Sequence, residues 1–186
     1  MDIKIFWDRD APSGLEIPLE KMISQILDIS VQVLSSPLLY NGFTSSRQQF
    51  DATSILSCMD IYKRRNGMHA PLLLVVNDDI FKPSFRYVYG LARPATGTAV
   101  VSTARLVNQF WDLPEDENAL IHRLITESAH ELGHLLGLDH CSDTRCVMSN
   151  PRCLDDLDRK KPWICDACKA AIRYPLPHIP VPVRME

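Results

Sequence analysis

The chain has 186 residues, 46% of them hydrophobic and 23% charged, which predicts one globular domain with its own core. Its net charge of -3 excludes the strongly basic surface that binds nucleic acid or anionic membranes, so we expect neither as a partner. The opening MDIKIFWDRD has no signal-peptide pattern, and no apolar run reaches the roughly 18 residues of a membrane span. We therefore expect a cytoplasmic protein.

The first half of the chain predicts strands that alternate with helices. Residues 3–7 and 31–34 have strand patterns, and apolar residues recur at helical spacing over residues 18–27 and 48–65. Residues 71–76, with the sequence PLLLVV, form the continuous apolar run of a strand that is covered on both faces. This alternation predicts a mainly parallel sheet.

The second half predicts two more strands, then a long helix and an extended tail. The strands cover residues 87–92 and 98–103, and one of them is expected at the sheet edge. Asp112 is the expected N-cap of the helix and Pro114 lies in its expected first turn. From Pro175, four prolines in eight residues predict an extended, polyproline-like chain.

The long helix ends in the motif HELGH, which has the spacing of metal ligands. His130 and His134 are four residues apart, so both imidazoles leave one face of a helix and can bind the same zinc ion. Glu131 is offset by one residue, so its carboxylate can miss the metal and reach a zinc-bound water. The motif predicts a zinc hydrolase with Glu131 as general base.

A third histidine follows a predicted turn. Gly137 can adopt the left-handed conformation that ends a helix, and the returning chain brings His140 to the same metal. Three protein ligands leave one zinc position open, which marks a catalytic rather than a structural site.

Four of the six cysteines form two close pairs that predict a second metal site. Cys141 and Cys146 follow His140 directly, and Cys165 and Cys168 form a CxxC pair, so four thiolates can enclose a structural zinc ion. Four free or core cysteines are the alternative interpretation. Because His140 and Cys141 are adjacent, we expect the structural zinc to hold the loop that presents the third histidine.

The combined motif resembles that of the metzincin zinc peptidases, in which a methionine-containing turn lies beneath three zinc-bound histidines. Met148 matches that methionine, although it could equally be an ordinary core residue. The cysteines at 141, 146, 165 and 168 make the pattern similar to the archaemetzincin family in particular. No tyrosine follows Met148 directly, so the tyrosine found there in some metzincins has no counterpart.

This resemblance implies the fold class and the domain organisation. The fold would be α/β (α+β) and metzincin-like, with a mixed, mostly parallel twisted sheet, an edge strand over the cleft, an active-site helix and a small zinc-stabilised C-terminal subdomain. Residues 1–186 would form one metalloprotease domain, with an upper subdomain of residues 1–137 and a lower one of residues 138–186. Peptide substrate would pair antiparallel with the edge strand. The candidate edge residues are Gly90, Leu91 and Ala92.

These patterns predict a zinc-dependent peptidase with two zinc ions per chain. A need for a free amino terminus, as in an aminopeptidase, is one expected source of narrow specificity. The main alternative is a non-catalytic or weakly active zinc protein that binds peptides or a partner. A purely structural zinc module and a nucleic-acid-binding ribbon are further alternatives. The presence of Glu131 favours the enzyme over a non-catalytic protein. Residues 141–186 contain eight basic and six acidic residues, and this small surplus argues against a nucleic-acid-binding ribbon.

Overall fold

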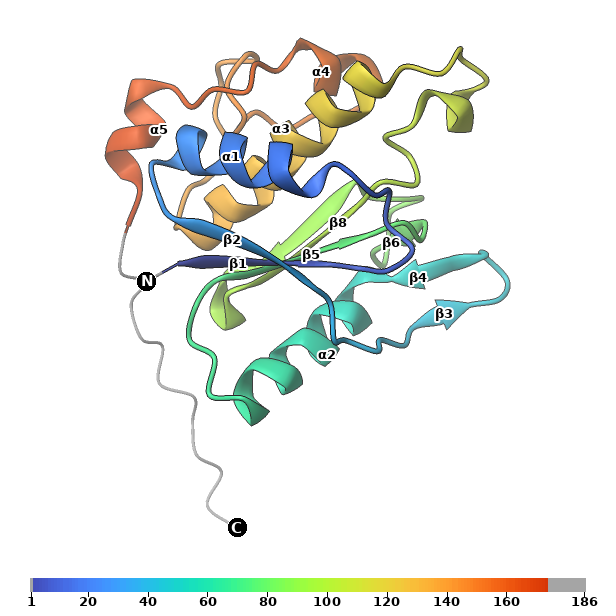
Figure 1. Cartoon of the computed structure of the whole chain (residues 1–186). Coiled ribbons are helices and arrows are strands. Elements are labelled where there is room, and N and C mark those ends of the chain that lie inside the picture. Colours follow the sequence, from blue (N-terminus) through green and yellow to red (C-terminus); the bar gives the residue numbers. More distant parts are fainter. Residues whose placement is uncertain (1, 174–186) are drawn as a thin grey trace.

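The structure is a computed structural model that describes residues 2–173, so the predicted proline-rich tail from Pro175 lies outside the described residues. A twisted five-stranded sheet forms its centre (Figure 1). The strand order is β2-β1-β5-β8-β7, in which all neighbours are parallel except β7 and β8. The strands are β1 (Ile3–Trp7), β2 (Val31–Ser35), β5 (Leu72–Val76), β7 (Gly90–Arg93) and β8 (Thr98–Ser102). The predicted mixed, mostly parallel sheet with an edge strand is confirmed.

Helices cover both faces of this sheet. α1 (Glu16–Leu27) and α3 (Glu117–Leu135) lie side by side on one face, and α2 (Ala52–Arg65) lies on the other (Figure 1). Side chains alternate between the faces of a strand, so Leu73 and Val75 pack under α1 and α3 while their neighbours pack against α2. All five residues of β5 are buried, which explains the absence of polar residues in that strand.

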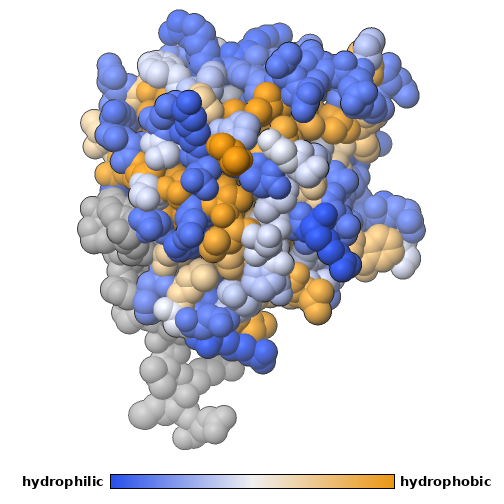
Figure 2. All heavy atoms as spheres, in the orientation of Figure 1, coloured by the Kyte–Doolittle hydropathy of each residue, from blue (hydrophilic) through white to orange (hydrophobic). Residues whose placement is uncertain are grey.

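Hydrophilic and hydrophobic residues are unevenly distributed on the surface. Hydrophilic residues cover the upper margin of the face in Figure 2, and hydrophobic residues form smaller patches in its middle. Some hydrophobic side chains are exposed, including Ile17 at 81% and Leu39 at 90%. Isolated exposed hydrophobic residues are common on folded proteins, so they mark no site by themselves.

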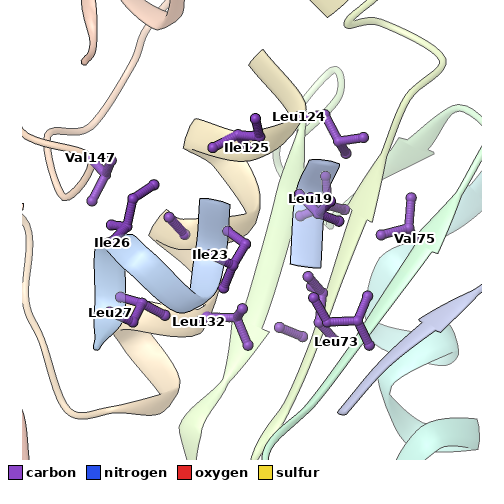
Figure 3. Close-up of a cluster of buried hydrophobic side chains, with 14 of the residues drawn as sticks. Leu19, Ile23, Ile26, Leu27, Leu73, Val75, Leu124, Ile125, Leu132 and Val147 are labelled. Atoms are coloured by element: carbon purple, nitrogen blue, oxygen red, sulfur yellow. The ribbon is translucent and has the colours of Figure 1, made fainter. Parts of the chain in front are cut away.

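The larger core lies between α1, α3 and the sheet. Figure 3 shows side chains of α1 and α3 meeting those of β5, with Val147 reaching the same cluster from the C-terminal segment. The labelled residues are Leu19, Ile23, Ile26, Leu27, Leu73, Val75, Leu124, Ile125, Leu132 and Val147. This packing fixes α3, the helix that carries the HELGH motif, against the sheet.

Shorter elements complete the described fold (Figure 1). A second sheet of order β3-β4-β6 flanks α2, and two short helices follow the motif. Their bounds are β3 (Phe43–Thr44), β4 (Gln49–Asp51), β6 (Ile80–Phe81), η1 (Pro94–Thr96), η2 (Asn108–Trp111), α4 (Leu154–Arg159) and α5 (Asp166–Ala171). Among residues 2–173, no helix has the length and apolar character needed to cross a bilayer.

The helix predicted over residues 18–27 begins earlier, at Glu16, and three other predicted boundaries also differ from the structure. The helix predicted over residues 48–65 begins after Asp51, whose carboxylate accepts a hydrogen bond from the Thr53 amide at 2.9 Å. The preceding residues pair with β6 as β4. Asp112 instead closes the 3-10 helix η2 in a left-handed conformation, and Asp116 caps α3 by accepting from the Ala119 amide at 3.0 Å.

The third boundary concerns the edge strand. The strand predicted over residues 87–92 pairs with β8 only from Gly90 to Arg93, so β7 is shorter and begins later. Tyr87 and Tyr89 precede it and stack edge-to-face with ring centroids 5.4 Å apart. The backbone of this segment still bonds to neighbouring strands, since the Val88 amide donates to the Ile80 carbonyl at 3.0 Å and the Ser102 amide to the Tyr89 carbonyl at 2.9 Å.

Candidate functional site

The C-terminal half of α3 carries three of the predicted site residues. His130 and Glu131 are buried, His134 is partly buried, and the sheet-facing side of the helix packs on β7 and β8. The four-residue spacing places the two histidine side chains on one face, with their Nε2 atoms 3.1 Å apart. Rigid packing therefore presents two imidazoles and a carboxylate at one end of a buried helix.

The chain turns after α3 and returns the third histidine, as predicted. Gly137 has φ +85°, the left-handed conformation that follows many helices, and the Leu138 amide donates to the Gly133 carbonyl at 3.0 Å. His140 is exposed, yet its ring lies 5.3 Å from that of His130 and 5.0 Å from that of His134. One nitrogen from each of the three histidines lies within 4.8 Å of the others.

Backbone carbonyls orient two of these rings. Nδ1 of His130 donates to the Val147 carbonyl and Nδ1 of His134 to the Leu138 carbonyl, each at 2.8 Å. Both Nε2 atoms are then free of protons and converge. Burial lowers the pKa of His130 well below its usual value and also lowers that of His134. Neutral, oriented imidazoles are the form that binds zinc, so this histidine cluster fits a zinc ion.

Met148 packs on α3 at Gly133. Its side chain is fully buried, and a Cβ added at Gly133 would lie only 2.3 Å from the Met148 sulfur. Gly133 lies between the two helical histidines, so the sulfur occupies the space of the missing side chain. The predicted methionine turn thus meets the helix at a glycine whose role was not apparent from the sequence.

Glu131 extends toward the sheet edge. A Cβ added at Gly90, the first residue of β7, would lie 2.8 Å from Oε1 of Glu131, so only glycine leaves room for the carboxylate. Burial raises the pKa of Glu131 well above its usual value, and the nearby Glu127 adds to the rise, while Lys160 and Lys82 oppose it. A carboxyl with a raised pKa is suited to accept and then release a proton.

A buried ion pair lies behind the histidines. Lys160 is fully buried; its Nζ donates to the Val147 carbonyl at 3.0 Å and lies 4.0 Å from Oε2 of Glu127. The same Nζ is 3.5 Å from Nδ1 of His130. Burial lowers the pKa of Lys160 and raises that of Glu127, and in each case the charge of the partner opposes the effect. This pair joins the segment after Met148 to the helix that carries the histidines.

The sequence contained only part of the signal for this pair. Glu127 lies one turn before Glu131 on the same helix face, so helical spacing could have placed it in the site. Lys160 is 30 residues beyond His130 and no local pattern marks it. Its contact depends on tertiary packing.

The four predicted cysteines also meet. Their sulfur atoms lie within 4.8 Å of one another, and Cys146 is buried. Backbone amides of Asp143, Cys165 and Cys168 each donate to a cysteine sulfur at 3.4 Å. Amide donation lowers the pKa of Cys165, whereas burial raises the pKa values of Cys146 and Cys168. Four clustered sulfurs with amide donors fit a tetrahedral zinc ion, whose charge would offset that of the thiolates.

The remaining cysteines lie outside this cluster. Cys58 is partly buried and faces Asn41, with Sγ 3.6 Å from the amide oxygen, so it fills the core only in part. Cys153 is exposed. Neither belongs to the metal-ligand groups found among the described residues.

The histidine cluster opens into a cleft of about 770 Å³. β7 has no strand partner on its outer side among the described residues, and its predicted edge residues Gly90, Leu91 and Ala92 line this cleft. Residues Asn150 to Arg152, soon after Met148, also line it. One cleft therefore contains three histidines, a buried carboxylate and a free strand edge.

Comparisons with known proteins agree with this arrangement. Residues 10–174 match the family described as peptidase family M54. The chain is 38% identical over 135 residues to an archaemetzincin of Pyrococcus horikoshii, covering 73% of this chain and 71% of the relative. It is 39% identical over 147 residues to an archaemetzincin of Aeropyrum pernix, covering 77% and 74% of the two chains.

Solved structures show the same fold. A zinc-dependent peptidase of Methanocorpusculum labreanum matches with a TM-score of 0.86 and 37% identity over 90% of this chain and 98% of that one. The archaemetzincin of Methanopyrus kandleri matches with a TM-score of 0.76 and 29% identity over 92% of each chain. The chain therefore belongs to peptidase family M54, the archaemetzincins, and is a zinc metallopeptidase that acts on peptides.

Proposed function

We propose that the protein hydrolyses peptide bonds with Glu131 as general base and with a catalytic zinc ion on His130, His134 and His140. The observation that carries the proposal is the position of the Glu131 carboxylate, buried beside the converging imidazoles and against the first residue of a free strand edge. When bound, zinc supplies a Lewis acid that polarises the scissile carbonyl and lowers the pKa of water.

The residues of the chain then have separate roles. Glu131 takes a proton from the attacking water on its carboxylate and delivers it to the leaving amine. The carbonyls of Val147 and Leu138 keep two imidazoles in the neutral, ligand-competent form. Met148 supports the helix from below, through its contact with Gly133.

The proposal includes the mode of substrate binding. The outer edge of β7 offers backbone groups to an extended peptide, and antiparallel pairing gives hydrogen bonds perpendicular to both strands. A scissile bond held opposite Gly90 would lie next to Glu131. Residues of the substrate that follow this bond would then pass the segment that precedes β7.

A second zinc ion on Cys141, Cys146, Cys165 and Cys168 completes the proposal. It would stabilise the proposed lower subdomain, residues 138–186, next to the upper subdomain of residues 1–137. The backbone amides that donate to the cysteine sulfurs support this assignment. The relatives, which are peptidases, do not favour the alternative of a non-catalytic binding protein.

Replacement of Glu131 by glutamine tests the mechanism. Glu131→Gln keeps the size of the side chain but removes the base, so kcat should fall by roughly 100-fold to 10,000-fold. Zinc content, measured by atomic emission, should stay at the wild-type value because Glu131 is not a proposed ligand. Cleavage of a mixed peptide library at the wild-type rate by this variant would exclude Glu131 as the base.

A further inference from the structure

Three cationic side chains line the cleft. Lys82 and Arg86 lie on the segment between β6 and β7, and Arg152 lies on the segment after the methionine turn. Lys82 is partly buried, and the two arginines are exposed. Cations from two separate segments therefore line the same cleft.

These charges form no ion pair within the described chain, although the backbone amide of Arg152 donates to the Asp156 carboxylate at 3.1 Å. Among residues 2–173, no acidic side chain forms an ion pair with Lys82, Arg86 or Arg152. The acidic residues that line the cleft are Glu127 and Glu131, which are both buried. Although the whole chain is negatively charged, the accessible part of this cleft is positive.

Hydrogen bonds hold the segment that presents two of the cations. Arg47 donates to the carbonyls of Phe85 at 2.9 Å and of Arg86 at 2.8 Å, and the Val88 amide donates to the Ile80 carbonyl at 3.0 Å. Nζ of Lys82 lies 4.4 Å from the centre of the Phe85 ring. The segment is thus held in place before a ligand binds, which lowers the entropy cost of binding.

The direction of β7 relates the cations to the scissile bond. Lys82 and Arg86 precede Gly90, the residue beside Glu131, whereas the rest of β7 runs away from them. Lys82 and Glu131 line the same cleft. In the antiparallel binding mode proposed above, the cations face the part of the peptide that follows the scissile bond.

We propose that Lys82, Arg86 and Arg152 bind a carboxylate of the substrate on the C-terminal side of the scissile bond. This inference rests on the proposed function and names the substrate class, which is peptides with a carboxylate on the C-terminal side of the scissile bond. The carboxylate belongs either to a Glu or Asp side chain or to the free C-terminus of a short peptide. Both sources offer the same planar acceptor, which arginine binds with two parallel hydrogen bonds.

Matched peptides separate the two sources. One set is amidated at its C-terminus and carries Glu or Gln at successive positions after the scissile bond. A second pair has no acidic side chain and ends in a free carboxylate or an amide. The zinc-loaded wild-type protein should cleave the preferred carboxylate peptide with a kcat/KM about fivefold to tenfold above its neutral partner. The preference should shrink as salt is added.

Charge reversal identifies the residues responsible. Arg86→Glu and Arg152→Glu should each remove the preference, and the double variant should favour Lys over Glu at the same peptide position. Arg65→Glu changes the net charge equally at an exposed position at the end of α2, away from the cleft, and should keep the wild-type preference. Equal cleavage of all matched peptides by the wild-type protein would overturn the inference.

Binding distinguishes this inference from the proposed function. The zinc-loaded Glu131→Gln protein should bind the carboxylate peptides about fivefold more tightly than the neutral ones, as measured by fluorescence anisotropy. If the wild-type protein cleaves no peptide and this preference persists, the proposed mechanism fails and the inference stands. If peptides are cleaved but binding shows no preference, the inference fails and the mechanism stands.

Discussion

The histidine cluster and the cysteine cluster lie next to each other in the chain but differ in the number of metal donors. The histidine cluster has three donors, one of them exposed, and it opens into the cleft beside a buried carboxylate. The cysteine cluster has four donors and amide hydrogen bonds to its sulfurs. An open coordination position suits catalysis and a complete set of ligands suits structural support, so the donor count alone separates the two roles.

The two clusters are also mechanically connected. His140 and Cys141 share a peptide bond, and the Cys141 amide donates to the Met148 carbonyl at 2.9 Å. Val147, the residue before Met148, accepts hydrogen bonds from both His130 and Lys160. These backbone links join the cysteine cluster to the segment that orients the histidines, and the first prediction below tests whether one cluster supports the other.

The largest effect is expected from Cys141→Ser. Loss of a ligand should release the zinc of the cysteine cluster and lower the free energy of unfolding by roughly 5 kcal/mol, or about 10–20 °C in Tm. Because His140 is adjacent, the zinc affinity of the histidine cluster should fall about 10-fold to 100-fold. Zinc content and a competition titration with a chelator measure both changes.

Cys153→Ser is the matched control, since Cys153 is exposed and lies outside the cluster. It should keep both zinc ions. If Cys141→Ser lost one zinc ion and kept full peptidase activity, the two clusters would be independent.

The next effect concerns the buried ion pair. Lys160→Met would leave the Glu127 carboxyl buried without its cation, at a cost of about 3–5 kcal/mol in the free energy of unfolding. The double variant Lys160→Met with Glu127→Gln should recover much of this loss, because no buried charge remains. Urea unfolding of the zinc-loaded proteins measures the difference, and equal stability of the single and double variants would contradict the pairing.

A smaller effect, confined to the open cluster, is expected from Gly90→Ala. The new methyl group would collide with Glu131 at 2.7 Å from Cγ and displace its carboxylate. Displacement of a catalytic group by about 1 Å can cost roughly 100-fold in kcat/KM. Zinc content and Tm should stay near the wild-type values, because neither cluster loses a ligand. Unchanged kcat/KM would show that the carboxylate acts from another position.

The smallest effect is expected on the far face of the sheet, away from both clusters, and it concerns the pH dependence of stability. Lys63 on α2 is buried and donates to the carbonyls of Thr96 and Gly97, and burial lowers its pKa to about 8 from 10.5. Between these pH values the unfolded chain holds a proton that the folded one has released, so this group makes stability rise with pH. The slope is at most about 1.4 kcal/mol per pH unit.

The wild-type protein and Lys63→Met should therefore differ in this slope. Unfolding free energies at several pH values across the window give the comparison. Identical slopes would show that Lys63 keeps its ordinary pKa. Loss of hydrogen bonds lowers the overall stability of the variant but does not produce a slope.

Local patterns predicted the elements that local chemistry determines. The apolar run of β5, the HELGH helix and the turn at Gly137 follow from burial, helical spacing and the left-handed preference of glycine. The convergence of the three histidines could be predicted for the same reason, since it needs one helix and one turn.

Other features depend on distant parts of the chain. Both Asp112 and Asp116 suit an N-cap, and tertiary packing, not residue type, decides that Asp116 caps α3. The start of β7 depends on pairing with β8, and Lys160 reaches His130 across 30 residues. The cations of the cleft come from two separate segments, so their presence in one cleft has no signal in local spacing.

The contact between Gly133 and Met148 has a consequence for engineering. A glycine inside a helix costs about 1 kcal/mol relative to alanine, so replacement by alanine is a common route to a more heat-resistant protein. Here the sulfur would lie 2.3 Å from the new Cβ, and the side chain beneath the histidines would be pushed away. A thermostable version of this peptidase would have to gain its stability at other positions. If the HELGH helix were grafted onto another protein, a methionine in the position of Met148 would have to be included to fill the space at Gly133.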